Sequence, residues 1–161
     1  MGQTVNSIEI QAILPTFLLI LVGEKMLLDY YKSLPDYIST IQLKELFEEF
    51  LFSISSRTID VEIALESLFE LSDRQWHTYE LLDSDVKSEI ETWLIGICNK
   101  ESINEIELIA SIIGRLGLVK VYKHLKNLLN NDNVKNEVRI TIQETVAELD
   151  GYVEDPYFGM K

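Results

Sequence analysis

Hydrophobic residues recur at helical spacing along most of the chain. Between Val61 and Leu71 they stand three or four positions apart, which places them on one stripe of a helix. No stretch alternates strictly between apolar and polar residues, and no hairpin dipeptide separates two apolar runs. The pattern therefore predicts an all-α fold. The predicted helices cover residues 16–32, 35–52, 61–71, 76–82, 85–98, 102–117, 119–129 and 134–149.

Polar residues at the helix boundaries support this assignment. Asp60 stands where an N-cap is expected, and Ser102 with Glu105 forms a capping box. Asp83 and Asp85 precede another predicted helix. Oxygen ligands two positions apart also occur in calcium loops, but the central glycine and the remaining ligands of such a loop are missing. We therefore expect this pair to cap a helix rather than to bind a cation.

One segment of the chain occurs twice. Residues 81–90 (LLDSDVKSEI) return as residues 128–138 (LLNNDNVKNEV), with one inserted residue. Helical repeats of roughly 40–47 residues are typical of HEAT or armadillo-like helix pairs, which stack into a solenoid. We predict one domain over residues 1–161. It would comprise N-terminal helices at 1–58, two repeats at 60–149 and a C-terminal tail at 150–161.

The C-terminal third resembles a HEAT repeat of bacterial helical-repeat proteins. The matching positions are Ala110, Gly114, Leu116, Gly117, Leu125, Leu128, Leu129, Asp132, Val138, Arg139, Ile142, Val146, Ala147 and Leu149. The earlier copy departs from the family pattern, because its first helix lacks the Gly-x-Leu-Gly ending and Lys87 stands where arginine is expected. The resemblance implies a short α-solenoid of about seven or eight stacked helices.

The charge of the chain is strongly one-sided. The net charge is −13, and the segment from Glu45 to Glu107 holds 16 acidic residues against four basic ones. Such a chain repels phosphate backbones, so we expect no nucleic-acid binding through a basic face. A basic protein is the partner that this field attracts.

Four carboxylates share one face of a predicted helix. Glu62, Glu66, Glu70 and Asp73 follow one another at spacings of three or four residues, and adjacent repeats would bring Glu105 beside them. We predict that these five residues bind the partner. The alternative is a solvated face without a binding role. In the tail, Tyr157 and Phe158 are predicted as apolar anchors for the same partner, and packing onto the last helix is their alternative.

Catalytic and metal-binding signatures are missing from the sequence. His77 and His124 stand in different repeats, and no Cys-x-x-Cys, His-Glu-x-x-His, phosphate-loop or Gly-x-Ser-x-Gly motif occurs. Cys98 follows an apolar run, which is typical of an inert buried thiol. We predict no catalytic residue, cofactor or metal. The apolar run 13–22 is too short to span a bilayer, and no positive region precedes it, so we expect a cytoplasmic protein without membrane contact.

Small size, acidity and a helical-repeat pattern are similar to the immunity partners of contact-dependent or polymorphic toxins. That resemblance implies a non-enzymatic protein that neutralises a basic toxin, often a nuclease, by occluding it. The alternative is a HEAT-type scaffold or adaptor that binds a peptide or a protein subunit. Helical-repeat DNA glycosylases also look similar in fold, but they need a basic concave surface, and this chain has the opposite charge.

Overall fold

The fold is described by a computed structural model, which covers residues 23–160. Within this range every regular element is a helix, as the sequence predicts. The residues of the predicted helix 16–32 that precede Gly23 lie outside the described part. The helices are α2 (Gly23–Lys32), α3 (Thr40–Ser56), α4 (Val61–Trp76), α5 (Ser84–Ile97), α6 (Ile103–Leu116), α7 (Val119–Leu128) and α8 (Asn136–Leu149).

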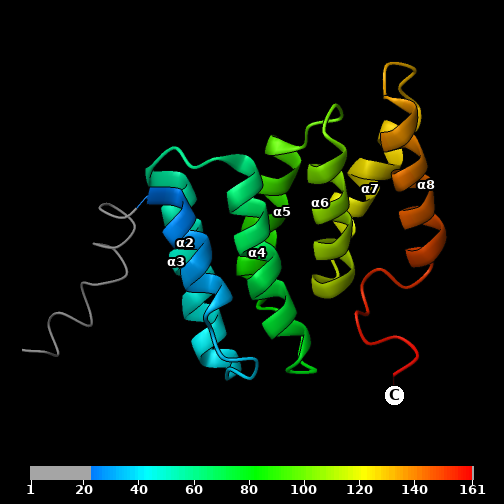
Figure 1. The fold of residues 1–161 in the computed structure, drawn as a ribbon. Coiled ribbons are helices and arrows are strands. Elements are labelled where there is room, and N and C mark those ends of the chain that lie inside the picture. The colour runs from blue at the N-terminus through cyan, green and yellow to red at the C-terminus, as the bar shows by residue number, and fades with distance from the viewer. Residues whose placement is uncertain (1–22, 161) are drawn as a thin grey trace, which may run out of the picture.

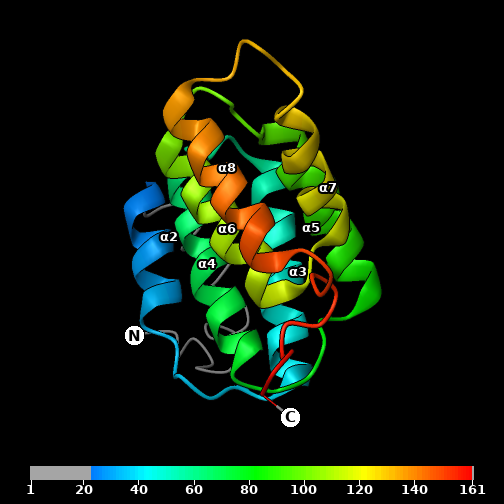
Figure 2. The same ribbon diagram turned by 90° about the vertical axis from the view of Figure 1, so that its right-hand side faces the viewer.

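The helices form two layers (Figure 1). In one layer α4 packs between α2 and α6, and α6 packs between α4 and α8. In the other layer α5 packs between α3 and α7. Figure 2 shows the two layers side by side. Consecutive helices run in opposite directions, so α2, α4, α6 and α8 all end at the same side of the molecule, the lower end in Figure 1.

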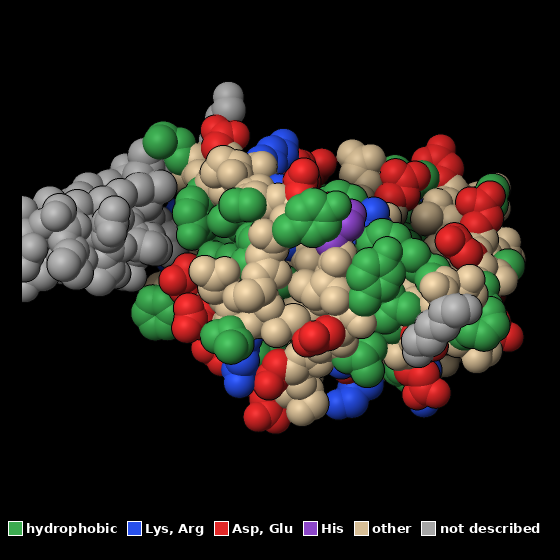
Figure 3. All heavy atoms as spheres, turned by 90° about the horizontal axis from the view of Figure 1, so that it is seen from below, with side chains coloured by type: hydrophobic (Ala, Val, Ile, Leu, Met, Phe, Trp, Pro, Cys, Tyr) green, Lys and Arg blue, Asp and Glu red, His purple; other side chains and the backbone are tan. Residues whose placement is uncertain are grey.

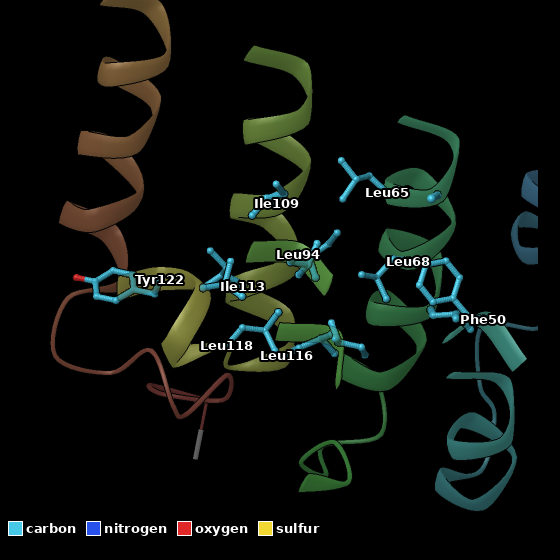
Figure 4. Close-up of a cluster of buried hydrophobic side chains, with 14 of the residues drawn as sticks. Phe50, Leu65, Leu68, Leu94, Ile109, Ile113, Leu116, Leu118 and Tyr122 are labelled. Atoms are coloured by element: carbon cyan, nitrogen blue, oxygen red, sulfur yellow. The ribbon is translucent and has the colours of Figure 1, made fainter. Parts of the chain in front are cut away.

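A continuous hydrophobic core fills the space between the layers. Figure 4 shows its central part, where Leu65 and Leu68 of α4 meet Leu94 of α5 and Ile109 and Ile113 of α6. All five side chains are fully buried. Shortening such a side chain to alanine typically costs about 2–5 kcal/mol. The apolar stripes read from the sequence are thus the faces that hold the layers together.

Helix caps form where the sequence predicts them. The Asp60 carboxylate accepts a hydrogen bond from the Ile63 N–H at 3.2 Å. Asp83 accepts from the Asp85 and Val86 N–H groups at 3.1 and 3.2 Å, and the Val86 bond is the largest cause that lowers the pKa of Asp83. The expected capping role of Asp83 is confirmed.

Several predicted helix boundaries are wrong, among them the ends predicted at residues 52 and 71, since α3 continues to Ser56 and α4 to Trp76. Residues 77–82 form a turn instead of part of a helix 76–82, because α4 continues to Trp76 and the chain then reverses. The helix predicted from residue 35 begins only at Thr40, after Ser39 has accepted the Gln42 N–H at 3.3 Å. Pro35 remains in the preceding loop, where its carbonyl accepts Nε of Arg74 at 3.4 Å.

The repeated sequence segment does not follow the packing of the helices. Residues 81–90 lead into α5, which packs with α3 and α7, whereas residues 128–138 lead into α8, which packs beside α6. The two copies therefore open helices in different layers. Helices α4 and α6 correspond to each other more closely than the helices that follow the two sequence copies do. Arg74 and Arg115 stand near the ends of these helices, and each donates Nη1 to the carbonyl four residues earlier, at 3.2 and 3.4 Å.

Candidate functional site

The acidic stripe of α4, comprising Glu62, Glu66, Glu70 and Asp73, is largely compensated by cations. Glu66 lies 3.8 Å from Nζ of Lys32 on α2. Glu70 forms an ion pair with Arg74, and Asp73 lies 3.3 Å from Nε of Arg115 on α6. Glu62 is exposed. Three of the four carboxylates therefore have an ion-pair partner within the chain.

Arg74 shows why this compensation serves the fold. The side chain is only 6% exposed, and its guanidinium donates to the carbonyls of Leu34 at 2.9 Å and Lys32 at 3.3 Å as well as to Glu70. A buried guanidinium needs this set of acceptors, because an unpaired buried charge is very unfavourable. Arg74 thus fastens the loop after α2 to the lower end of α4.

Glu105 lies near the start of the stripe rather than along it. Partial burial and the charges of Glu62 and Asp60 raise the pKa of Glu105. The predicted capping box is half formed. Ser102 accepts the Glu105 N–H at 3.4 Å, while Oε2 of Glu105 is buried and has no hydrogen-bond partner among the described residues. The nearby carboxylates of Glu62 and Asp60 raise the energy of the ionised form of Glu105.

Aromatic rings gather at the lower end of the molecule, where we define an aromatic platform of Tyr37, Trp76, His77, Tyr79 and Tyr157. The Trp76 and Tyr157 rings stack at 6.4 Å, and Tyr79 lies 5.5 Å from Tyr157. His77 meets Trp76 and Tyr37 edge to face at 5.4 and 5.9 Å. Tyr37 and Tyr79 are 80% and 62% exposed. Figure 3 looks onto this end and shows hydrophobic side chains spread across it, with acidic side chains around them.

Tyr157 attaches the C-terminal tail to this platform. The ring is 5% exposed, and its hydroxyl donates to the carbonyls of Glu80 at 3.0 Å and Gln75 at 3.3 Å. Nε1 of Trp76 donates to the Pro156 carbonyl at 3.2 Å. Tyr157 therefore supports the fold instead of presenting the free surface from which a partner contact was predicted. Its neighbour Phe158 is 61% exposed and stacks on Tyr152 at 4.4 Å.

Tyr79, in the turn that follows α4, has an unfavourable backbone conformation. Tyr79 has φ +57°, a left-handed value that costs a bulky residue roughly 1–2 kcal/mol. The Glu80 carbonyl next to it accepts from both Tyr157 and Nε2 of Gln75, the latter at 2.8 Å. These bonds fix the backbone of the turn, and the Tyr79 ring lies against Tyr157 and Trp76. Strained and well-fixed residues of this kind gather at binding sites.

A groove of about 530 Å³ adjoins the platform, between the lower ends of α4, α6 and α8 and the tail. We call it the lower groove. Its carboxylates are Asp73, Glu148 and Asp155, and its aromatic rings are Trp76, Tyr152 and Phe158. Arg115 also lines the groove, where it pairs with Asp73. The groove thus combines negative charge with aromatic surface.

Gly117 allows the tail to close this groove. The residue ends α6 at φ +69°, and a Cβ atom there would stand 3.2 Å from the carbonyl oxygens of Val153 and Glu154 and from Pro156. Only glycine combines this conformation with such a close approach of the tail. The glycine that the HEAT resemblance singles out therefore helps to place the wall of the lower groove.

The described residues contain no site that is organised for metal binding or for thiol chemistry. No group of three His, Cys, Asp or Glu side chains within residues 23–160 could hold a metal ion. Burial, and to a lesser extent Glu105, raises the pKa of Cys98 to about 11, so its thiol stays protonated at neutral pH. No helix in the described part of the chain is long and apolar enough to cross a membrane.

Sequence reasoning found the carboxylates of α4 but missed their cations. Only Arg74 stands at helical spacing from its partner, whereas Lys32 and Arg115 come from α2 and α6. The lower groove was missed because Tyr152 and Phe158 come from a tail without periodic pattern, and only the packing of the tail brings them to Trp76 at the end of α4. Comparisons with protein-family models, curated proteins and solved structures find no match.

Proposed function

We propose that this chain is a non-enzymatic binding protein of the HEAT-like α-solenoid type, and that it neutralises a basic protein partner by occluding it. The observation that carries the proposal is the lower groove, where the exposed Glu148 and three aromatic rings line one cavity, with the exposed rings of Tyr37 and Tyr79 at the same end of the molecule. Aromatic anchors in a partly enclosed site supply most of the binding energy at protein interfaces.

The net charge of the chain supports the proposal that its partner is a basic protein. With a net charge of −13 the molecule attracts a basic surface over a distance, which raises the association rate and selects against acidic partners. Affinity then has to come from close contacts, for which Phe158, Tyr79 and Tyr37 are exposed at the lower end. A basic toxin domain, such as a nuclease, has the surface that this arrangement fits, and the chain would act as its immunity protein in the cytoplasm.

Co-expression tests the immunity function. A toxin domain encoded beside the gene for this chain should kill cells when expressed alone and spare them when the chain is present. The double variant Glu148→Lys/Phe158→Ala should lose protection, whereas Glu137→Lys, which reverses an exposed charge at the start of α8, should protect like the wild type. Protection that survives the groove variant would contradict the proposed site.

The alternative function is a scaffold or adaptor that binds a peptide or a subunit. The open lower groove is the observation that favours it, because a chain segment could lie along it. The two functions differ in outcome. A scaffold would bind through the same groove residues and give no protection against the neighbouring toxin.

A further inference from the structure

A second groove lies in the other helix layer, between α3 and α5. It encloses about 610 Å³, and its floor is formed by Leu51, Phe52, Ile54 and Trp93. Phe52 is 60% exposed although it stands well inside α3. Leaving a phenylalanine ring in water forgoes roughly 1.5–3 kcal/mol of burial energy. An exposed phenylalanine ring in a groove offers an apolar contact to a partner.

The groove continues into a second hollow. An adjoining hollow of about 460 Å³ shares Ile54, Ser55 and Trp93 with it and continues past the end of α3. Trp93 packs against the buried core, where its ring meets Phe50 edge to face at 5.6 Å. Ser55 and Thr92 donate their hydroxyl hydrogens to carbonyls of their own helices, so the polar groups of the wall are already satisfied.

Acidic side chains flank this apolar floor. Glu48 of α3 and Glu89 of α5 line the groove from opposite sides. Asp85 continues the face of α5 one turn away and is exposed, whereas Glu45 lines a separate hollow beside the loop between α2 and α3. Lys44 is the cation near this end, where it lies 3.2 Å from Asp83 and 4.0 Å from Glu48. Glu48 and Glu89 thus place negative charge on both sides of the floor, while Arg57 lines the adjoining hollow.

We propose that the α3–α5 groove binds a basic amphipathic helix of a protein partner. The apolar stripe of such a helix would cover Phe52 and Trp93, and lysines or arginines on its flanks would meet Glu48 and Glu89. This is the arrangement by which helices are recognised in grooves elsewhere. The α3–α5 groove shares no lining residue with the lower groove, so this proposal stands or falls independently of the proposed function.

A titration with synthetic peptides tests the proposal on the full chain. The probe is a helical peptide of leucine and lysine, about five turns long, with its leucines on one face. One control peptide scrambles the leucines around the helix, and another replaces lysine with glutamate. The two tryptophans report the location by NMR, because Trp93 lines the α3–α5 groove and Trp76 the lower groove.

The basic amphipathic peptide should shift the indole N–H signal of Trp93 and leave that of Trp76 in place. Phe52→Ala should weaken its binding at least tenfold, and Glu48→Lys/Glu89→Lys should weaken it further. Ile140→Ala is the matched control, since this side chain is 46% exposed on α8, and it should bind like the wild type. The exposure of Phe52 predicts that its variant folds normally, which circular dichroism verifies.

Equal binding of the scrambled peptide, a shift of Trp76 alone, or unchanged binding by Phe52→Ala would each overturn the proposal. Sedimentation of the free protein adds a further outcome. Self-association that disappears with Phe52→Ala would assign the groove to a second copy of the chain and would also overturn it.

Discussion

The acidic stripe of α4 and the lower groove meet at Asp73, but their side chains act differently. Along the stripe, Lys32, Arg74 and Arg115 pair with the carboxylates and join α2, α4 and α6. In the lower groove, Glu148 lies beside the exposed ring of Phe158. The comparison teaches that net charge alone does not locate a binding surface. Compensated carboxylates hold the fold, whereas Glu148, which is exposed in the lower groove, is available to a partner.

The largest expected effect comes from removing Arg74, the buried cation at the lower end of the stripe. Arg74→Met should lower the free energy of unfolding by about 3–5 kcal/mol, because it leaves Glu70 without its partner and several buried carbonyls without a donor. Chemical denaturation measures the change. Arg57→Met, at the end of α3, is the control and should stay within about 0.5 kcal/mol of the wild type. Similar losses in both variants would mean that Arg74 has no special structural role.

The second-largest loss of stability is expected at the contact between the C-terminal tail and the end of α6. Gly117→Ala should destabilise the protein by about 1–2 kcal/mol, since alanine is strained at φ +69° and its Cβ meets the tail. Hydrogen exchange should also become faster in residues 150–160. Gly96→Ala is the matched control, because its Cβ meets nothing within 4 Å in helix α5, and alanine there should stabilise the protein by about 0.5–1 kcal/mol. A tail unaffected by Gly117→Ala would contradict this account of the lower groove.

The hydroxyl of Tyr157 should contribute about 1 kcal/mol. Tyr157→Phe keeps the stacked ring but removes the donor to Glu80 and Gln75, so thermal unfolding should begin at lower temperature. Tyr152→Phe removes an exposed hydroxyl that donates to the carbonyl of Glu148, four residues earlier, and should have a smaller effect. If the two variants unfold alike, the tail is held by its rings alone.

The smallest effect is pH-dependent and concerns Glu105. Its folded-state pKa is raised by partial burial and by Glu62 and Asp60, so folding favours the protonated form. The stability that protonation gives is complete below the pKa of the unfolded chain and is lost as pH rises through the folded pKa. Glu105→Gln should therefore be slightly more stable than the wild type at pH 7, and the difference should shrink toward pH 4. A variant that is less stable at pH 7 would contradict this reasoning.

Periodic segments could be predicted well from the sequence because their apolar stripes are the faces that pack. The predicted helices 102–117 and 119–129 agree with α6 and α7 to within a residue at each end. The turn after Trp76 was mistaken for a helix because Trp76, Tyr79 and Leu82 happen to stand at helical spacing. Lys32 and Arg115 could not be assigned to the stripe, because only the packing of three helices brings them there.

The C-terminal tail shows a different limit of sequence reasoning. Nothing in its pattern predicts that Tyr157 is buried while the adjacent Phe158 is exposed. The outcome depends on two distant features, the turn at Tyr79 and the close approach at Gly117. Platforms built by irregular segments depend on such long-range contacts, and they leave no periodic signal.

The most direct test measures partner binding by two variants in parallel. For the toxin domain encoded beside this chain, Glu148→Lys/Phe158→Ala should unfold like the wild type but bind at least a hundredfold more weakly, which corresponds to about 2.7 kcal/mol. Glu70→Gln should be less stable but, where it remains folded, should bind like the wild type. The opposite pattern, with binding lost in Glu70→Gln and kept in the groove variant, would contradict the division between stripe and groove.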